Sequence, residues 1–232
     1  MTRHARFRLV LVVRDQSVGC FIKTFHATVI EVFGSTNFVF LVLDDEYPTF
    51  DKPSIKMWRL AARTVGIPLL IRASDDNPAP ILNVLDCCAA GFVVPQVASI
   101  EQADWLANSM VYFPGGRGIA GAAWAGAYGA HSPPEHPSAA DAEVLLICQI
   151  EDYEGAENAK AIASVDGSDA LFVGRADLTV SSGLTLFSDG DNAKKADKPL
   201  GGEGATTGLF VAPTEYVGSW HAKGLSLCQW GL

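Results

Sequence analysis

The chain has 232 residues, of which 49% are hydrophobic and 19% charged, a balance typical of a globular protein with a substantial core. Its formal net charge of -9 argues against nucleic acid as a partner, because phosphate backbones are bound by clustered Lys and Arg. No apolar run is long enough to cross a bilayer, and the apolar stretch near the N-terminus is interrupted too early, at Arg14 and Asp15, for a secretory signal. The five cysteines match no zinc-binding spacing, so we expect reduced, buried thiols in a cytoplasmic protein without a membrane partner.

Short apolar runs alternate with helical patterns along the chain, which is typical of βαβ units and a parallel sheet. Several of the runs are almost continuous in Val, Ile, Leu and Phe, as expected for strands that are covered on both faces. Eight such strands favour a closed (β/α)8 TIM barrel over an open sheet, so residues 1–232 are predicted to form a single α/β barrel domain. The predicted strands are 19–23, 38–43, 68–72, 91–95, 144–150, 170–174, 208–212 and 225–229.

The connections between these strands are predicted to contain helices at 27–33, 54–65, 78–88, 100–109 and 155–164. Two stretches rich in Gly, Ala and Pro, 115–137 and 188–207, have no clean helical period and are expected to be irregular. Little sequence follows the eighth predicted strand, so we expect the barrel to lack its final C-terminal helix. Such a gap would expose an apolar face.

Polar residues stand where several predicted strands end. Asp44, Asp45 and Glu46 follow the second strand, and Arg72 ends the third. The fifth strand ends in Gln149-Ile150-Glu151, and the sixth leads into Arg175-Ala176-Asp177. Because active-site residues of a parallel barrel lie at the carboxyl ends of the strands, one Arg, one Gln and several carboxylates should meet at one mouth.

Glu151 and Asp177 come from neighbouring strands and could share a hard divalent cation. Mg2+ typically binds one or two protein carboxylates, keeps waters and leaves places for substrate oxygens. Such a cation can act as a Lewis acid on a 2-oxo acid, and the planar fork of Arg72 suits a carboxylate or developing negative charge nearby. The alternative is that each carboxylate merely caps a helix or forms a salt bridge.

Five segments, in the same order, resemble the HpcH/HpaI aldolase family, which includes 4-hydroxy-2-oxoheptanedioate aldolase and macrophomate synthase. The resemblance runs from about residue 19 to residue 183 and resumes weakly at 208–232. The segments are Gly19-Cys20-Phe21-Ile22-Lys23, Phe40-Leu41-Val42-Leu43-Asp44-Asp45-Glu46, Gly115-Gly116-Arg117-Gly118, Gln149-Ile150-Glu151 and Leu171-Phe172-Val173-Gly174-Arg175-Ala176-Asp177-Leu178.

This resemblance implies a carbon–carbon lyase of the class II pyruvate aldolase type, with Glu151 and Asp177 as ligands of Mg2+, Mn2+ or Co2+. It implies that Gln149 and the backbone at Ala176 contact the pyruvate moiety and that Arg72 stabilises developing charge on the substrate. The implied substrates are pyruvate, oxaloacetate or a 4-hydroxy-2-oxo acid, and the implied assembly is a homo-oligomer.

The sequence departs from the family pattern at the catalytic base. The family has a His where this chain has Tyr47, and Asp86 matches the acid that supports that base. An unperturbed Tyr has a pKa of about 10, so Tyr47 could serve as a proton donor or an activated phenolate, or turnover could be impaired. His26 is a candidate replacement base, and Trp124 stands where the family loop has an Arg. The alternative function is therefore a paralogue that binds metal and 2-oxo acids without efficient turnover.

Overall fold

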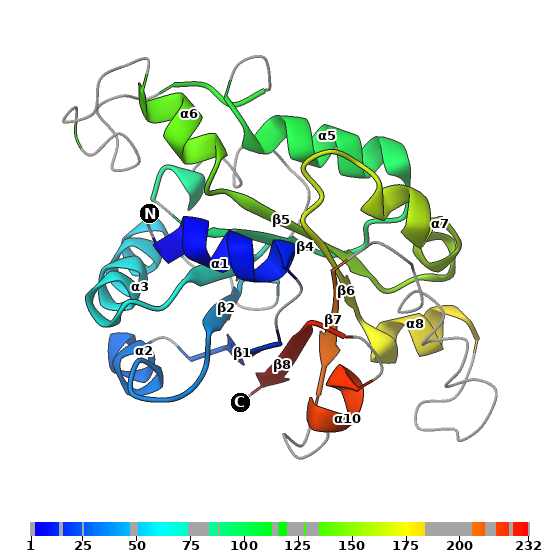
Figure 1. The fold of residues 1–232 in the computed structure, drawn as a ribbon, viewed down its shortest axis with the longest axis horizontal. Coiled ribbons are helices and arrows are strands. Elements are labelled where there is room, and N and C mark those ends of the chain that lie inside the picture. Colours follow the sequence, from blue (N-terminus) through cyan, green and yellow to red (C-terminus); the bar gives the residue numbers. More distant parts are fainter. Residues whose placement is uncertain are drawn as a thin grey trace.

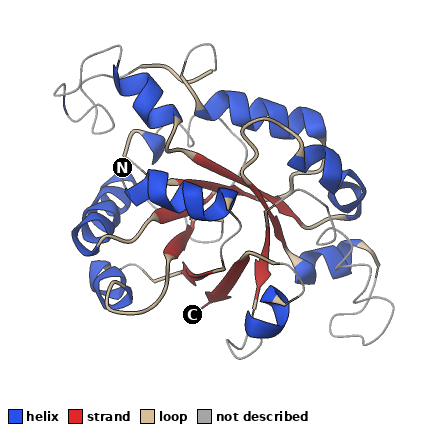
Figure 2. Ribbon diagram, viewed as in Figure 1, coloured by secondary structure: helices blue, strands red, loops and turns tan. Residues whose placement is uncertain are grey.

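The computed structural model describes residues 3–13, 16–24, 26–46, 51–73, 84–87, 89–112, 116–119, 128, 135–183, 206–211, 217–222 and 225–231. Eight parallel strands pair in chain order, and β8 closes the barrel on β1 (Figures 1 and 2). Each observed strand overlaps its predicted range, so the predicted (β/α)8 barrel is confirmed. The strands are β1 (Ser17–Ile22), β2 (Phe40–Asp44), β3 (Leu69–Arg72), β4 (Gly91–Val94), β5 (Leu145–Ile150), β6 (Ala170–Val173), β7 (Thr207–Phe210) and β8 (Leu227–Gly231).

Helices surround this ring of strands (Figure 2). Four of them match predicted helices: α2 (Ala27–Phe33), α3 (Lys52–Val65), α5 (Ile100–Met110) and α7 (Tyr153–Ala163). Four more were not predicted: α1 (Arg3–Val12), α6 (Glu135–Asp141), α8 (Arg175–Ser181) and α10 (Val217–His221). The predicted helix at 78–88 and the irregular stretches at 115–137 and 188–207 lie largely outside the described residues. No helix in the described part of the chain is long and apolar enough to span a membrane.

Local capping residues set the ends of the longer helices. The side chains of Asp51, Ser99 and Asp152 each accept a hydrogen bond from a backbone N–H in the first turn of α3, α5 and α7 respectively. α3 ends at Gly66, whose φ of 79° is the left-handed conformation that favours glycine. These caps fix the residues at which the helices begin or end. Because all eight strands are parallel, their carboxyl ends lie at one mouth of the barrel.

Helix α1 lies across the amino end of the barrel and closes it (Figure 1). Phe7 and Leu11 are buried in the cluster that fills the barrel interior, and the ring of Phe7 lies 5.0 Å from that of Phe40. Thr206 donates a hydrogen bond to the carbonyl of Leu11, and Arg8 forms a 2.9 Å ion pair with Asp169. The N-terminal stretch, in which no element was predicted, therefore plugs the barrel with Phe7 and Leu11, whereas Leu9 and Val12 of the same helix are exposed.

The docking of α1 is predicted to depend on pH through His4. Burial, with a smaller effect of Arg59, lowers the pKa of His4 to about 4, although Glu143 lies 3.9 Å from its Nδ1. The unfolded chain has a His pKa near 6.5, so His4 favours folding fully above that pH, and this contribution is lost as the pH falls towards 4. Between pH 7.5 and 5 the loss should be about 2 kcal/mol. Urea unfolding of the wild type and His4→Gln at both pH values measures it, and equal pH dependence in both proteins would contradict it.

Candidate active site

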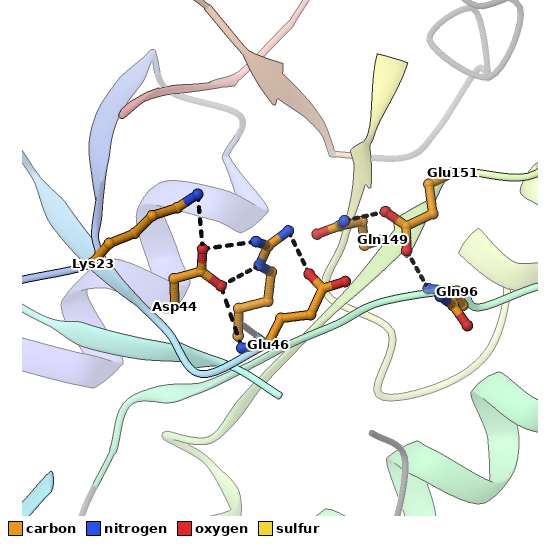
Figure 3. A network of polar contacts seen from close by, with 7 residues as sticks. Lys23, Asp44, Glu46, Gln96, Gln149 and Glu151 are labelled. Carbon is orange, nitrogen blue, oxygen red and sulfur yellow. Dashed lines mark hydrogen bonds and ion pairs between the residues drawn. The ribbon is translucent and has the colours of Figure 1, made fainter. Parts of the chain in front are cut away.

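Arg72 is fixed at the mouth of the barrel by the residues that follow β2. Its Nε and Nη2 donate to the two carboxylate oxygens of Asp44, each at 2.8 Å, and Asp44 is fully buried. Nη1 lies 2.7 Å from Oε2 of Glu46, and the guanidinium stacks 5.1 Å from the ring centre of Phe21. Lys23, at the end of β1, also lies 3.5 Å from Asp44 (Figure 3). The guanidinium is thus held in one orientation at the end of β3.

Glu151 stands on the β5 side of the same group (Figure 3). Its Oε1 accepts a 2.9 Å hydrogen bond from the backbone N–H of Gln96, and its Oε2 accepts one from the Nε2 of Gln149. Gln96 has a φ of 55°, an uncommon conformation for a residue other than glycine, which aims its N–H at the carboxylate. Both Glu151 and Gln149 are buried, so their orientations are set by packing as well as by hydrogen bonds.

The carboxylates at the mouth of the barrel raise one another's pKa values through electrostatic repulsion. Burial raises the pKa of Glu151, the hydrogen bond from Gln149 lowers it, and the like charges of Glu46 and Asp177 raise it. Burial also raises the pKa of Glu46, and Asp177 again contributes to this shift. Asp177 lies in the first turn of α8, at the exposed edge of this group. The three carboxylates therefore form one electrostatic cluster.

The charge balance of the mouth fits a divalent cation. Four carboxylates, those of Asp44, Glu46, Glu151 and Asp177, interact there, and the cations Arg72 and Lys23 oppose them. In the described part of the chain, no three His, Cys, Asp or Glu side chains are close enough together to form a complete metal site. Glu151 and Asp177 as two ligands, with the other positions taken by water and substrate, match the requirements of Mg2+.

Gly174, at the end of β6, leaves the space that Glu151 occupies. A Cβ at this position would lie 2.8 Å from the Cβ of Glu151 and 2.9 Å from its Oε2. We predict that Gly174→Ala displaces the carboxylate and lowers Mn2+ affinity roughly 10- to 100-fold, as expected for a residue that orients a ligand. Calorimetric titration with Mn2+ measures this. Gly218→Ala on α10 is the matched control, because its Cβ would meet nothing within 4 Å. Equal affinity in the two variants would contradict the role of Gly174.

The structure does not bring every predicted residue to this mouth. Asp86 precedes the first residue of β4, so it lies towards the amino end of the barrel, where its Oδ1 is 3.2 Å from Nη2 of the buried Arg117. The structure records no contact between Asp86 and Arg72 among the described residues. The predicted support of the catalytic base by Asp86 stays a prediction. His26 caps α2, where its Nδ1 accepts from the backbone of Thr28, a structural role for an exposed side chain.

Tyr47 and Trp124 lie outside the described residues. Arg72, Gln149, Glu151, Ala176 and Asp177 all occupy the carboxyl end of the barrel, as predicted. The roles of these residues in metal and substrate binding stay predictions.

Three contributors to the mouth were not singled out from the sequence: Lys23, Gln96 and Gly174. Lys23 and Gly174 lie within resembling segments, and their position at strand ends was the available signal. Gln96 contributes its backbone N–H, and the direction of a backbone N–H cannot be predicted from the residue types in the sequence.

The sequence of residues 17–232 matches the family model described as HpcH/HpaI aldolase/citrate lyase, and the chain belongs to this family. It is 32% identical over 175 residues to a 4-hydroxy-2-oxovalerate aldolase of Novosphingobium aromaticivorans, covering 75% of this chain and 66% of that protein. It is 33% identical over 165 residues to a hydroxypyruvate/pyruvate aldolase of Roseobacter denitrificans, covering 71% of this chain and 64% of that protein. The matched region thus spans just under two thirds of the length of these relatives.

Solved structures share the fold. An HpcH/HpaI aldolase/citrate lyase family protein of Burkholderia cenocepacia superposes with a TM-score of 0.91 at 22% identity, covering 98% of this chain and 92% of that one. Macrophomate synthase gives a TM-score of 0.76 at 21% identity, covering 96% and 83%. The citrate lyase beta subunit of M. tuberculosis, complexed with oxaloacetate and magnesium, gives 0.57 at 15% identity, covering 95% and 93%. These structures show the fold, and the match of residues 17–232 to the family model confirms the family predicted from the five segments.

Proposed function

We propose that this protein is a divalent-metal-dependent lyase that cleaves or forms a carbon–carbon bond next to a pyruvate enolate. The observation that carries the proposal is the mouth of the barrel, where Arg72 is clamped by Asp44 and interacts electrostatically with Glu151, which in turn interacts electrostatically with Asp177. The names of the relatives support it, because they are aldolases of 2-oxo acids. The magnesium and oxaloacetate of the citrate lyase subunit support a metal-bound 2-oxo acid here.

Glu151 and Asp177 are the proposed ligands of Mg2+, with Mn2+ or Co2+ as substitutes. The bound cation supplies Lewis acidity to the ketone of the 2-oxo acid. Gln149 and the backbone at Ala176 hold the pyruvate moiety, and Arg72 offsets the negative charge that develops as the enolate forms. Because Asp44 already fixes the guanidinium, Arg72 needs no reorganisation during the reaction.

Two reactions lead to the same enolate. In aldol cleavage, a base removes the proton of the C4 hydroxyl, the C3–C4 bond breaks, an aldehyde leaves, and the electron pair of that bond enters the enolate. In oxaloacetate decarboxylation the electron pair comes from the bond to the departing carboxylate, so no hydroxyl is deprotonated. In both cases protonation at C3 gives pyruvate. Decarboxylation therefore tolerates Tyr47 at the base position better than aldol cleavage does.

A second candidate is a protein that binds metal and 2-oxo acids with inefficient turnover, as the replacement of the family His by Tyr47 suggests. In either case we expect a cytoplasmic homo-oligomer with a small 2-oxo acid as its ligand. The two candidates share a binding site and differ in rate.

Pyruvate release from oxaloacetate and from a 4-hydroxy-2-oxo acid, with Mg2+ and with EDTA, separates the candidates. The lyase releases pyruvate from oxaloacetate only with metal, at a rate well above that of free Mg2+. Tight metal-dependent binding of pyruvate without release from either acid would favour the second candidate. Absence of both binding and release would refute the two together.

A further inference from the structure

Helix α8 carries two of the proposed binding groups in its first turn. The backbone of Ala176 and the carboxylate of Asp177 directly follow β6 and Gly174. The helix has only 7 residues, and its N-cap, Gly174, makes no side-chain hydrogen bond. A helix this short is not stable by itself, and a first turn without a cap leaves its backbone N–H groups without support. Contacts outside the helix must therefore hold the turn that carries Asp177.

On one side, α8 is attached to α7. Leu178 is buried in a small apolar cluster with Val173 of β6 and Ala156 of α7. The hydroxyl of Ser181 accepts a 3.2 Å hydrogen bond from the backbone N–H of Tyr153, the first residue of α7. Because Ser181 is the last residue of α8, this hydrogen bond holds the end of the helix opposite to its first turn.

On the other side, the first residue of α8 contacts α10, and the two helices lie next to each other (Figure 1). The guanidinium of Arg175 lies over the ring of Trp220, 5.0 Å from the ring centre, which is within the range of a cation–π interaction. Trp220 and Val217 in turn pack against the apolar cluster between α10 and the strands β7 and β8. Arg175 thus ties the first turn of α8 to a ring that is itself packed on the barrel wall.

We infer that Arg175 and Trp220 are positioning residues, which hold the carboxylate of Asp177 where it binds the divalent cation. This inference rests on the proposed function. Asp177 follows Arg175 by two residues in the same helical turn, so a shift of that turn moves its carboxylate directly. Glu151 is oriented by hydrogen bonds of its own, from β5 and from the backbone after β4. Loss of the contact between Arg175 and Trp220 should therefore disturb one ligand and leave the other in place.

The test keeps every charge, because a cation near the site also repels the metal. Trp220→Leu removes the ring, and Arg175→Lys keeps the positive charge but loses the planar group that stacks on an aromatic face. The contact can transfer to the metal site no more free energy than it contains. Each variant is therefore expected to lower Mn2+ affinity by about fivefold, as measured by calorimetric titration of the full chain. If both variants break the same contact, the double variant should bind Mn2+ no more weakly than either single one.

Two further variants separate positioning from a general loss of packing. Trp220→Tyr keeps an aromatic ring and should recover most of the affinity that Trp220→Leu loses. Val217→Ala is the matched control, because it weakens the packing of α10 on the same cluster without removing the ring. It should lower thermal stability and leave Mn2+ affinity unchanged. Thermal unfolding without metal verifies that each variant is folded, and Arg175→Lys carries the test if Trp220→Leu does not fold.

Wild-type Mn2+ affinity in folded Trp220→Leu and Arg175→Lys, while Asp177→Asn loses the metal, would overturn the inference and leave the proposed function standing. An equal loss in Val217→Ala and Trp220→Leu would also overturn it, because general loosening of α10 would then explain the effect. Failure of the wild type to bind Mn2+ would refute the proposed function and this inference with it.

Discussion

Glu151→Gln is expected to lower Mn2+ affinity by about 100-fold or more while the barrel still folds. An amide is a poor ligand for a hard cation, and the substitution would also remove a negative charge from the cluster with Glu46 and Asp177. The replacement keeps the shape of the side chain and an oxygen that can accept from the backbone N–H of Gln96. Without metal it relieves carboxylate repulsion, so thermal stability should be equal to that of the wild type or higher. Calorimetry with Mn2+ and thermal unfolding without metal measure both effects.

Asp152→Asn is the matched control for this variant. Asp152 is the neighbouring carboxylate, but it caps α7 through a 2.6 Å hydrogen bond from the N–H of Gly155, a role that Asn can also fill. Its Mn2+ affinity should stay close to that of the wild type, whereas Asp177→Asn should resemble Glu151→Gln. Unchanged affinity in both Glu151→Gln and Asp177→Asn would refute the metal assignment.

Tyr47→His is expected to raise the rate of aldol cleavage roughly 100- to 10,000-fold, the usual contribution of a general base. An imidazole titrates near neutral pH and can take the C4 hydroxyl proton, which an unperturbed phenol cannot do. Oxaloacetate decarboxylation should change by less than about tenfold, because its enolate forms without that proton transfer. Steady-state rates of both reactions with saturating Mg2+ measure the difference.

Tyr47→Phe distinguishes a gained base from a lost phenol, since it removes the hydroxyl without adding an imidazole. It should not accelerate aldol cleavage. Equal acceleration of the two reactions by Tyr47→His would show that this position is not that of the base. If every variant binds metal and none turns over, the second candidate function gains support.

Most strands could be predicted because they are short apolar runs with both faces buried, and such runs are visible without knowledge of their partners. Helix α1 was missed for the opposite reason. Its buried face consists mainly of Phe7 and Leu11, and most of its other positions are polar or only partly buried. A helix that plugs a barrel is recognised only once the opening that it fills is known. Helix α8 was not predicted, because Gly174 and Arg175 were interpreted as the end of the sixth strand.

The candidate site was predictable as a set of strand ends but not as a set of contacts. Arg72, Gln149 and Glu151 meet at the mouth because parallel strands end on one side of a barrel. Nothing in the sequence indicates that Asp44 clamps Arg72 with both oxygens or that Gln96 adopts a positive φ to reach Glu151. The contact between Asp86 and Arg117 was likewise not visible in the sequence, and the predicted support of the base by Asp86 stays a prediction.

Metal-dependent exchange of the C3 protons of pyruvate with deuterium, followed by NMR, tests the central claim most directly. Exchange requires that the protein bind pyruvate, that a base from the protein or the solvent remove a C3 proton, and that the enolate be stabilised, so it needs neither the natural aldehyde nor the natural substrate. We expect the wild type to catalyse this exchange when Mg2+ is present and to stop when EDTA is added. The Glu151→Gln variant should show little exchange under the same conditions. Exchange that is equal with and without EDTA, or equal in the wild type and Glu151→Gln, would contradict enolate formation at this metal site.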